Sequence, residues 1–528
     1  MQNVPAASQM ARAKPASTLL ELPDPCLVAV LRCCNDDQHC LFSAARAHGR
    51  LHQAAVLALS SIKAISATQQ QADSMLQYLE KHGQHLDSIS ISGDGEGTFV
   101  LPLPSNLRLS SMQLDSVGLQ LQPGHGLLGV LGPTDAVAAL TQLRLTGCTL
   151  RDSTTADALA AAMWQLPEGM QHLSITCSAF RFPAGVCRQL QHLTHLDIAV
   201  PGLGSASSKQ QDIQALTRLV DLRLCDVGED ITVDMLSGMQ HLTRLEFSCE
   251  SMDLSVLDGR TQLQHLALGL MIADAQVAQL LSHLRYMQQL TYLNLSDSMS
   301  TDEDGDDNPP AIAYAALTAS SKLAHLDISW CSLPADAWKH MLSAGRQLPH
   351  LHYLSIENLD QPSGDEGIPP RGSSLVRCCP NLQSLDLRDM RCSVKLLAAL
   401  PRLTRLSSLR LAHSECKGKG LEVLSQLTGL QELHAQFPFS TQQGLLLQLT
   451  QLKQLTQLVY EGRLDGAFKS ARFSNQVSYP SCCCCCASSS VCLLCLSCVA
   501  GQLHPCSLGL AAHFSHTRGH GHHVKCPA

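Results

Sequence analysis

The sequence predicts an α/β solenoid, with short parallel strands along a concave side and helices or turns along a convex side. The first observation is a phrase that occurs fifteen times between Leu86 and Tyr460: an aliphatic residue, two free positions, an aliphatic residue, one free position and a third aliphatic residue. The second is the period, because the first positions of the phrases run from 86 to 455 at an average of about 26 residues. The third is the spacing of two between the last aliphatic residues, which places them on one face of a strand.

A strand that buries only one face is not stable alone, so successive units are expected to stack in parallel and close a continuous core. We expect Leu326, Leu385 and Leu409, each the second aliphatic residue of its phrase, to lie in that core. The clearest phrases begin at Leu140, Leu219, Leu242, Leu323, Leu382 and Leu406, and the others begin at Leu86, Leu109, Met170, Leu193, Leu263, Leu290, Leu351, Leu430 and Leu455.

A different pattern occupies residues 19–62, where apolar residues recur at helical spacing and the strand phrase does not occur. Leu22 and Pro23 open this segment, and a polar break at residues 35–37 divides it. We therefore expect a small helical segment at 19–62, after a disordered N-terminus at 1–18.

Helices are expected on the convex side wherever strong helix formers gather between two strand phrases. The best candidates are residues 155–164, 336–342 and 394–400. Residues 63–465 are accordingly assigned to the repeat domain.

Residues 466–528 are assigned to a tail, expected to be disordered, in which the composition changes to Cys and His. Ten of the 24 cysteines and six of the 24 histidines lie in the last 52 residues. Three interpretations stay open. Gln476-Val477-Ser478 can be encoded by a splice-donor consensus, so the tail is a translated intron; or it is a disordered segment with a function; or it is a metal or lipid site. We assign no metal ligands there.

The repeats resemble those of leucine-rich repeat proteins over about 375 of the 528 residues. Some phrases continue with a cysteine, as at Cys148 and Cys331, which is similar to the Cys-containing repeats of intracellular members of that family. The resemblance implies a horseshoe whose buried thiols stand where other members have Asn. We expect both thiols to act as small fillers of the core.

The helical segment resembles the F-box, in which a Leu-Pro pair opens the first helix. That family binds the Skp1 subunit of a cullin–RING ubiquitin ligase, while a repeat domain behind it holds the substrate. The match departs from the family in its later helix, which lacks the usual Val-Cys and Trp, and in cysteines that replace aliphatic residues. The alternative is that the segment only caps the first repeat. The resemblance implies that a Skp1-like subunit contacts Leu22, Pro23, Leu27, Val30 and Leu31.

A protein partner is expected on the concave face, on the free positions that flank the second and third aliphatic residues. Strands stack about 5 Å apart, so Tyr292, His325 and Tyr353 should line up as one ladder, and aromatic residues are common interface hot spots. The loops at 301–310 and 361–371 each follow a strand and are expected on the same rim. The predicted contact residues are Tyr292, Asn294, His325, Asp327, Trp330, Tyr353 and Glu357.

Composition excludes other classes of partner. The 37 basic and 45 acidic residues are interspersed, without the basic stripe of a nucleic-acid binder. No secretory signal opens the chain, and the cysteines before the tail have no repeated pair spacing, which favours a cytoplasmic or nuclear location without a membrane partner. His325 and Asp327 share a strand face with no nucleophile beside them. We therefore predict no enzyme, no cofactor and no metal site.

The sequence as a whole favours a substrate-recruiting adapter of an SCF-type (Skp1–cullin–F-box) ubiquitin ligase. The alternative is a leucine-rich repeat interaction scaffold without a ligase role.

Overall fold

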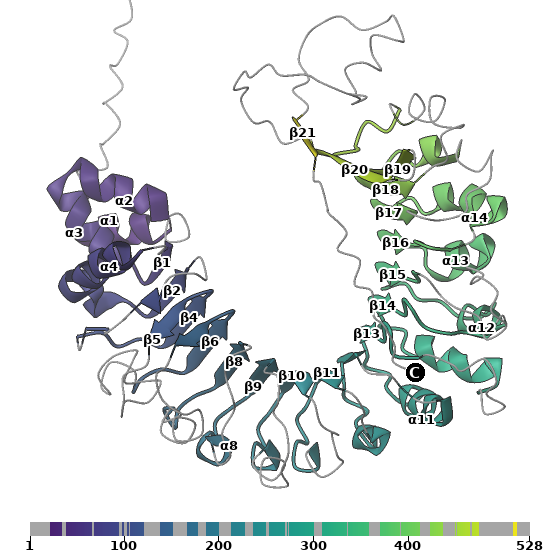
Figure 1. The fold of residues 1–528 in the computed structure, drawn as a ribbon, viewed down its shortest axis with the longest axis horizontal. Coiled ribbons are helices and arrows are strands. Elements are labelled where there is room, and N and C mark those ends of the chain that lie inside the picture. Colours follow the sequence, from purple (N-terminus) through teal and green to yellow (C-terminus); the bar gives the residue numbers. More distant parts are fainter. Residues whose placement is uncertain are drawn as a thin grey trace, which may run out of the picture. The chain divides into compact units, whose positions relative to one another are not determined.

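The structure, a computed structural model, is an α/β leucine-rich repeat solenoid, which confirms the predicted fold class. The chain divides into two compact units, Met1–Leu219 (unit 1) and Val220–Ala528 (unit 2), and Figure 1 labels many of their elements. The structure describes residues 22–33, 38–65, 68–93, 98–99, 103–104, 106–120, 138–151, 166–177, 186–199, 213–227, 236–249, 253–269, 272, 274–299, 309–334, 336–357, 370–390, 392–411, 423–436, 449, 451–464, 467–474 and 511–514.

Unit 1 begins with helices and continues with a parallel sheet in the order β1-β2-β4-β6-β8-β9, beside a small parallel sheet β3-β5-β7. Its helical elements are α1 (Asp24–Arg32), α2 (Gln38–Ala47), α3 (Gly49–Ala58), α4 (Gln69–His82), η2 (Gly83–His85) and α8 (Val186–Gln189). Its strands are β1 (Ser61–Ile65), β2 (Ser88–Ser92), β3 (Thr98–Phe99), β4 (Ser111–Asp115), β5 (Gly118–Gln120), β6 (Gln142–Thr146), β7 (Thr149–Arg151), β8 (His172–Thr176) and β9 (His195–Ala199).

The first strand lies earlier than the sequence analysis places it. Residues 61 and 62 were expected in the helical segment, yet they begin β1, which pairs in parallel with β2 from Ser61↔Ser88 onward. The phrase is present here as Leu59-x-x-Ile62-x-Ala64, with a small residue in the third aliphatic position. Methyl-sized Ala64 obscures the pattern, although the strand still buries Ile62.

Unit 2 is a parallel sheet from β10 to β19 in chain order, with helices and 3-10 segments on one side (Figure 1). We call the opposite side of this sheet the inner face. The strands are β10 (Asp221–Val227), β11 (Arg244–Cys249), β12 (His265–Gly269), β13 (Tyr292–Asn294), β14 (His325–Asp327), β15 (Tyr353–Ser355), β16 (Ser384–Asp386), β17 (Ser408–Leu411), β18 (Glu432–Gln436) and β19 (Gln457–Leu464). The helical segments are η3 (Leu254–Leu257), α11 (Asp274–Leu284), η4 (Ala311–Thr318), α12 (Ala337–Met341), α13 (Gly372–Cys378), α14 (Val394–Ala399) and η5 (Leu400–Arg402).

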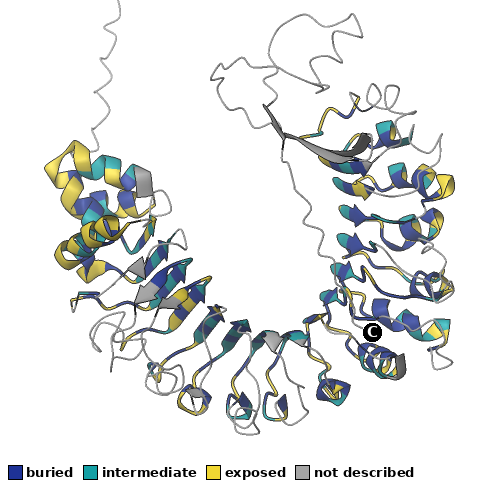
Figure 2. Cartoon of the chain, viewed as in Figure 1, coloured by how far each residue is buried: buried dark blue, intermediate teal, exposed yellow. Residues whose placement is uncertain are grey.

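The core lies between the strand layer and the helical layer. Leu326, Leu385 and Leu409 are buried as predicted. Leu326 pairs with Leu354 of β15, Leu354 with Leu385, and Leu385 with Leu409. Figure 2 shows the contrast between the buried strands and the helices of unit 1, where exposed residues are frequent. Burial of each leucine contributes roughly 1.5–3 kcal/mol.

Small polar groups join neighbouring repeats just after the strands. Cys148 Sγ lies 3.5 Å from the carbonyl oxygen of Leu114, and Cys331 Sγ lies 3.0 Å from that of Leu295. Ser298 makes the equivalent bond with its hydroxyl. The two thiols are buried, as predicted, and each also donates to the backbone of the preceding repeat.

Two of the three predicted convex helices fall within the described residues, as α12 and α14. The N-terminus at 1–18, the helix expected at 155–164 and most of the loops at 301–310 and 361–371 lie outside them. Close packing explains Gly372 in α13, because a Cβ there would lie 2.6 Å from Ala399 Cβ.

The tail differs in part from expectation. A disordered tail was expected at 466–528, but β20 (Ala467–Ser474) pairs in antiparallel fashion with β19, and β21 (Ala511–Phe514) pairs with β20. The two residues between β19 and β20 are Asp465-Gly466, a pair that favours two-residue hairpin loops. The remainder of the tail, with most of its cysteines, lies outside the described residues.

We predict that Leu385→Ala lowers the free energy of unfolding by about 2–5 kcal/mol, because the side chain is buried on all sides and leaves a cavity. Urea denaturation followed by circular dichroism measures the change. Leu57→Ala is the matched control, since Leu57 is 44% exposed and its truncation should change stability little. Equal effects of the two substitutions would contradict the repeat register.

Candidate functional site

Four aromatic rings form a continuous stack across the inner face of unit 2. The ring centroids of His265 and Tyr292 lie 3.9 Å apart, those of Tyr292 and His325 4.1 Å, and those of His325 and Tyr353 4.0 Å. The planes of successive rings differ by 10°, 11° and 1°. The parallel register pairs these residues directly, so the predicted alignment of Tyr292, His325 and Tyr353 is confirmed. We call the four residues the ring ladder.

His265 is the member that the sequence analysis missed. It precedes the second aliphatic residue of the phrase that begins at Leu263, so the register alone was sufficient to find it. The same position also gives a stacked pair in unit 1, His172 and His195, with centroids 4.0 Å apart. A reading of that position in every phrase would have found both.

The histidines of the ring ladder are uncharged at neutral pH. Burial lowers the pKa of His265 to about 3, and the charges of Arg244 and Arg223 act in the same direction. Burial also lowers the pKa of His325, against the attraction of Asp327. Nε2 of His265 is buried without a hydrogen-bond partner among the described residues. Glu246 Oε2 lies 3.8 Å from this nitrogen, beyond hydrogen-bonding distance, and at His325 burial outweighs the attraction of Asp327.

Charged side chains flank the ladder at its His265 end. Arg223 Nε lies 3.3 Å from Glu246 Oε2, and Arg244 Nε lies 3.5 Å from Asp221 Oδ1. Each of these two arginines thus has a carboxylate at ion-pairing distance. Partial exposure means that such pairs add little to stability, but they orient the side chains beside His265.

A second charged group flanks the Tyr353 end. Asp386, whose side chain is 2% exposed, accepts from Arg388 Nε at 3.0 Å, and Arg410 Nη1 lies 3.6 Å from its Oδ2. Arg388 also pairs with Glu357. The pKa of the Glu357 carboxyl is nevertheless raised, because its burial outweighs the attraction of Arg388. Glu357 was among the contact residues predicted from the sequence, whereas Asp386 and Arg388 were not.

Two predicted contact residues also have a role in the fold. Asn294 Oδ1 accepts from the backbone N–H of Ser296 at 2.9 Å, and Asp327 Oδ1 accepts from that of Ser329 at 3.0 Å. Such Asx turns end a strand by offering the backbone a side-chain partner. Among the described residues, Asp327 makes no further side-chain hydrogen bond or ion pair.

Trp330 follows the turn of β14 in a left-handed backbone conformation, with φ of 61°. Asp297 and Asp389 occupy the same position in their repeats with φ of 60° and 55°. Asp tolerates this conformation, whereas a bulky residue is rare in it. The indole is nonetheless 47% exposed, so the fold holds a large aromatic side chain in solvent at a backbone cost.

The predicted Skp1 contacts divide into two sets. Leu27 and Leu31 are buried in unit 1 and hold α1 in place. Leu22 is half-buried, and Pro23 and Val30 are exposed. The turn before α1 is fixed by α3, because Arg50 donates to the carbonyl oxygen of Leu22 at 2.9 Å and to Asp24 Oδ1 at 3.1 Å.

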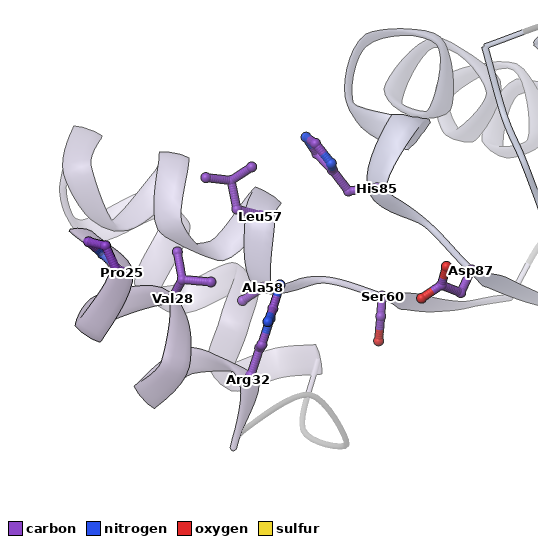
Figure 3. Close-up of a pocket in the computed structure, with 8 residues that line it drawn as sticks. All are labelled: Pro25, Val28, Arg32, Leu57, Ala58, Ser60, His85 and Asp87. Carbon is purple, nitrogen blue, oxygen red and sulfur yellow. The ribbon is translucent and has the colours of Figure 1, made fainter.

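A cavity of about 720 Å³ lies where α1 and α3 meet the start of the repeats. Figure 3 shows Val28 and Leu57 on two adjacent helices, with His85 and Asp87 contributed from the segment before β2. This cavity could not be predicted from the repeat pattern, because its lining residues come from separate parts of the chain between Pro25 and Asp87. It is lined by Pro25, Val28, Arg32, Leu57, Ala58, Ser60, His85 and Asp87.

Two further observations concern the described part of the chain. No three His, Cys, Asp or Glu side chains there come together as a group that could hold a metal ion. None of its helices has both the length and the apolar character needed to cross a membrane.

Comparisons with known proteins find likeness in solved structures alone. No protein-family model and no curated protein matches the chain. An internalin of Listeria monocytogenes is 15% identical, with 73% of this chain and 92% of that chain covered and a TM-score of 0.39. A leucine-rich repeat protein of Leptospira interrogans is 16% identical, with coverages of 78% and 85% and a TM-score of 0.40. A TDR receptor is 14% identical, with coverages of 74% and 66% and a TM-score of 0.43.

The ring ladder should make stability depend on pH. Because the folded-state pKa of His265 lies below its unfolded value near 6.5, the unfolded chain binds the proton more readily. The stability that the neutral ring contributes is thus complete above about pH 6.5 and is lost as pH falls towards 3. Between about pH 6.5 and pH 5, the free energy of unfolding of wild type should therefore fall. In His265→Phe, which keeps a ring, this fall should be smaller by about 1–2 kcal/mol, as measured by urea titration at both pH values. Identical losses would disprove this.

Trp330 provides a test of the left-handed turn. Asn and Ala both remove the indole, but only Asn readily adopts a positive φ. We predict that Trp330→Asn is more stable than Trp330→Ala by about 1 kcal/mol in chemical denaturation. Equal stability of the two variants would show that the backbone at residue 330 is not strained.

Proposed function

We propose that this chain is a substrate-recruiting adapter, with a protein partner on the inner face of unit 2 and a Skp1-like subunit of an SCF-type ubiquitin ligase on helices α1–α3. The observation that carries the proposal is the ring ladder. Four aromatic rings in one stack form a patterned surface that the repeat fold itself does not require. Its centre is the predicted contact set around Tyr292, His325 and Tyr353.

A protein partner suits this surface for an energetic reason. Tyr292 and His325 each lie between two rings at about 4 Å, and Tyr353 stacks on one, so little side-chain entropy remains to be lost on binding. Tyr and Trp are frequent among residues that dominate binding energy. Tyr353 on β15 and the exposed Trp330 in the turn after β14 supply such anchors in neighbouring repeats.

The recruitment of a Skp1-like subunit is supported by the exposed apolar side chains of unit 1. Val30 on α1 is 42% exposed, and Phe42 on α2 and Leu57 on α3 are also exposed. A docking surface on these helices would draw on these three apolar side chains. Within the predicted set, Leu22, Pro23 and Val30 would touch the partner, because Leu27 and Leu31 are buried.

The alternative, an interaction scaffold without a ligase role, is favoured by a separate observation. β1 pairs with β2 and directly follows α3, so the helices stand at the start of the unit 1 sheet. Terminal units of a solenoid need a cap that shields the open end of the core. In this alternative the helices serve that purpose alone.

Substitutions at two exposed valines distinguish the adapter function from the scaffold function. Val30 and Val394 are 42% and 46% exposed, and each lies on a helix. We expect Val30→Asp to abolish capture of purified Skp1 by the full chain, whereas Val394→Asp should retain it. Both variants should melt within a few degrees of wild type, since surface substitutions change stability little.

The outcomes are distinct. A wild-type chain that never captures Skp1 excludes the adapter. If Val30→Asp lowers the melting temperature and no Skp1 is captured by any variant, the helices are a cap. Tyr353→Ser should leave Skp1 capture intact and remove the protein bound on the inner face, because the two surfaces belong to different units.

A further inference from the structure

Carboxylates outnumber guanidinium groups toward the Tyr353 end of the ring ladder, whereas at the His265 end Arg223 and Arg244 each have a carboxylate partner. The residues compared are the strands β13 to β17 with the turns that follow, at 292–297, 325–330, 353–357, 384–389 and 408–411. Among these described residues there are more carboxylates than guanidinium groups. The carboxylates are Asp297, Asp327, Glu357, Asp386 and Asp389, and the guanidinium groups are Arg388 and Arg410.

Both of these arginines are already engaged. Arg388 donates to Asp386 and to Glu357, and Arg410 lies 3.6 Å from Asp386. Asp386 is buried beneath them and needs no further cation. The surplus negative charge therefore belongs to the carboxylates nearer the ladder.

Asp327 is the central one. Its Oδ1 serves the turn at Ser329, and it has no ion-pair partner within the part of the chain that the structure describes. It lies in the strand of His325 and pairs in register with Ser355, beside Tyr353. His325 does not offset its charge, because burial keeps that ring neutral.

Glu357 is close to the same place. It follows β15 two residues after Ser355, and its single cation is shared with Asp386. Its pKa is raised because burial and the carboxylates of Asp386, Asp389 and Asp327 outweigh the one guanidinium. A second cation would relieve this repulsion.

Two aromatic groups border the position. The Tyr353 ring ends the ladder, and the next residues along that row are the small Ser384 and Ser408, which leave one face of the ring without an aromatic neighbour. Trp330 donates its backbone N–H to the carbonyl oxygen of Glu357 at 2.8 Å, so the exposed Trp330 belongs to the turn beside that residue. A guanidinium binds well to carboxylates and to aromatic faces at once.

We propose that the segment bound on this face is a basic, arginine-bearing peptide segment of the protein partner, whose guanidinium groups pair with Asp327 and Glu357 between Tyr353 and Trp330. This inference rests on the proposed function of the inner face and adds its ligand chemistry. The carboxylates supply charge complementarity, and the ring ladder supplies a rigid border. The His265 end, where each arginine already has a carboxylate, takes the neutral part of the segment.

The test is fluorescence anisotropy of a labelled peptide of alternating arginine and alanine, titrated with the full chain. The matched peptide carries glutamate in place of arginine. We expect the basic peptide to bind and the acidic peptide not to bind. In the double variant Asp327→Asn/Glu357→Gln the dissociation constant should rise at least about tenfold.

General attraction to an acidic protein is controlled by Asp258→Asn/Asp336→Asn, which removes the same charge from exposed positions on the helical side of unit 2. This control should bind the basic peptide within about twofold of wild type. Equal losses in the two double variants would overturn the proposal, as would binding of the acidic peptide. Trp330 gives a local signal, since its emission should change on binding and the change should vanish in Trp330→Phe.

Failure here is distinguishable from failure of the proposed function. If Tyr353→Ser removes a bound protein but wild type ignores the basic peptide, the inner face is a binding site of other chemistry and this inference is wrong. If wild type binds the peptide and the asparagine–glutamine variant does not, the inference holds whether or not Skp1 is captured by α1–α3.

Discussion

Burial of two aliphatic side chains per strand, at a constant parallel register, is the constraint on which the rest of the structure depends. Leu293, Leu326 and Leu354 succeed one another in that register and are almost fully buried. A slip of one residue would turn such side chains to the inner face, at a loss of roughly 1.5–3 kcal/mol each. The register is therefore fixed, and every residue beside these leucines takes a fixed place in a row.

The candidate site follows from that register. A ring in one repeat must lie against the ring at the same position in the next, which is why His265 to Tyr353 form a stack without contributing to the core. The same geometry brings like charges together around Asp327 and Glu357. The stacking and the clustering of charge thus both follow from the parallel register. Because His265 and His325 are neutral, the ring ladder adds no positive charge beside the carboxylates.

The helices of unit 1 combine a buried side with an exposed side. They bury Leu27 and Leu31 and display Val30, so a single helix serves both the internal packing and an outer surface. Arg50 fixes the turn at Leu22 and Asp24, which gives the Leu-Pro opening a defined position. Under the proposed adapter function this surface would contact a Skp1-like subunit, and under the alternative the same helices would shield the first repeat.

The sequence by itself determined the fold, the core leucines, the convex helices α12 and α14, and the alignment of Tyr292, His325 and Tyr353, because these depend only on a period of two within strands and about 26 between them. The tertiary structure alone decided the rest. Asn294 and Asp327 each end a strand through a local turn, and Trp330 has a positive φ. The cavity beside Leu57 is lined by residues of the first helices and of the segment before β2. These features depend on contacts between particular atoms of neighbouring repeats and helices. The repeat period along the chain does not predict such contacts.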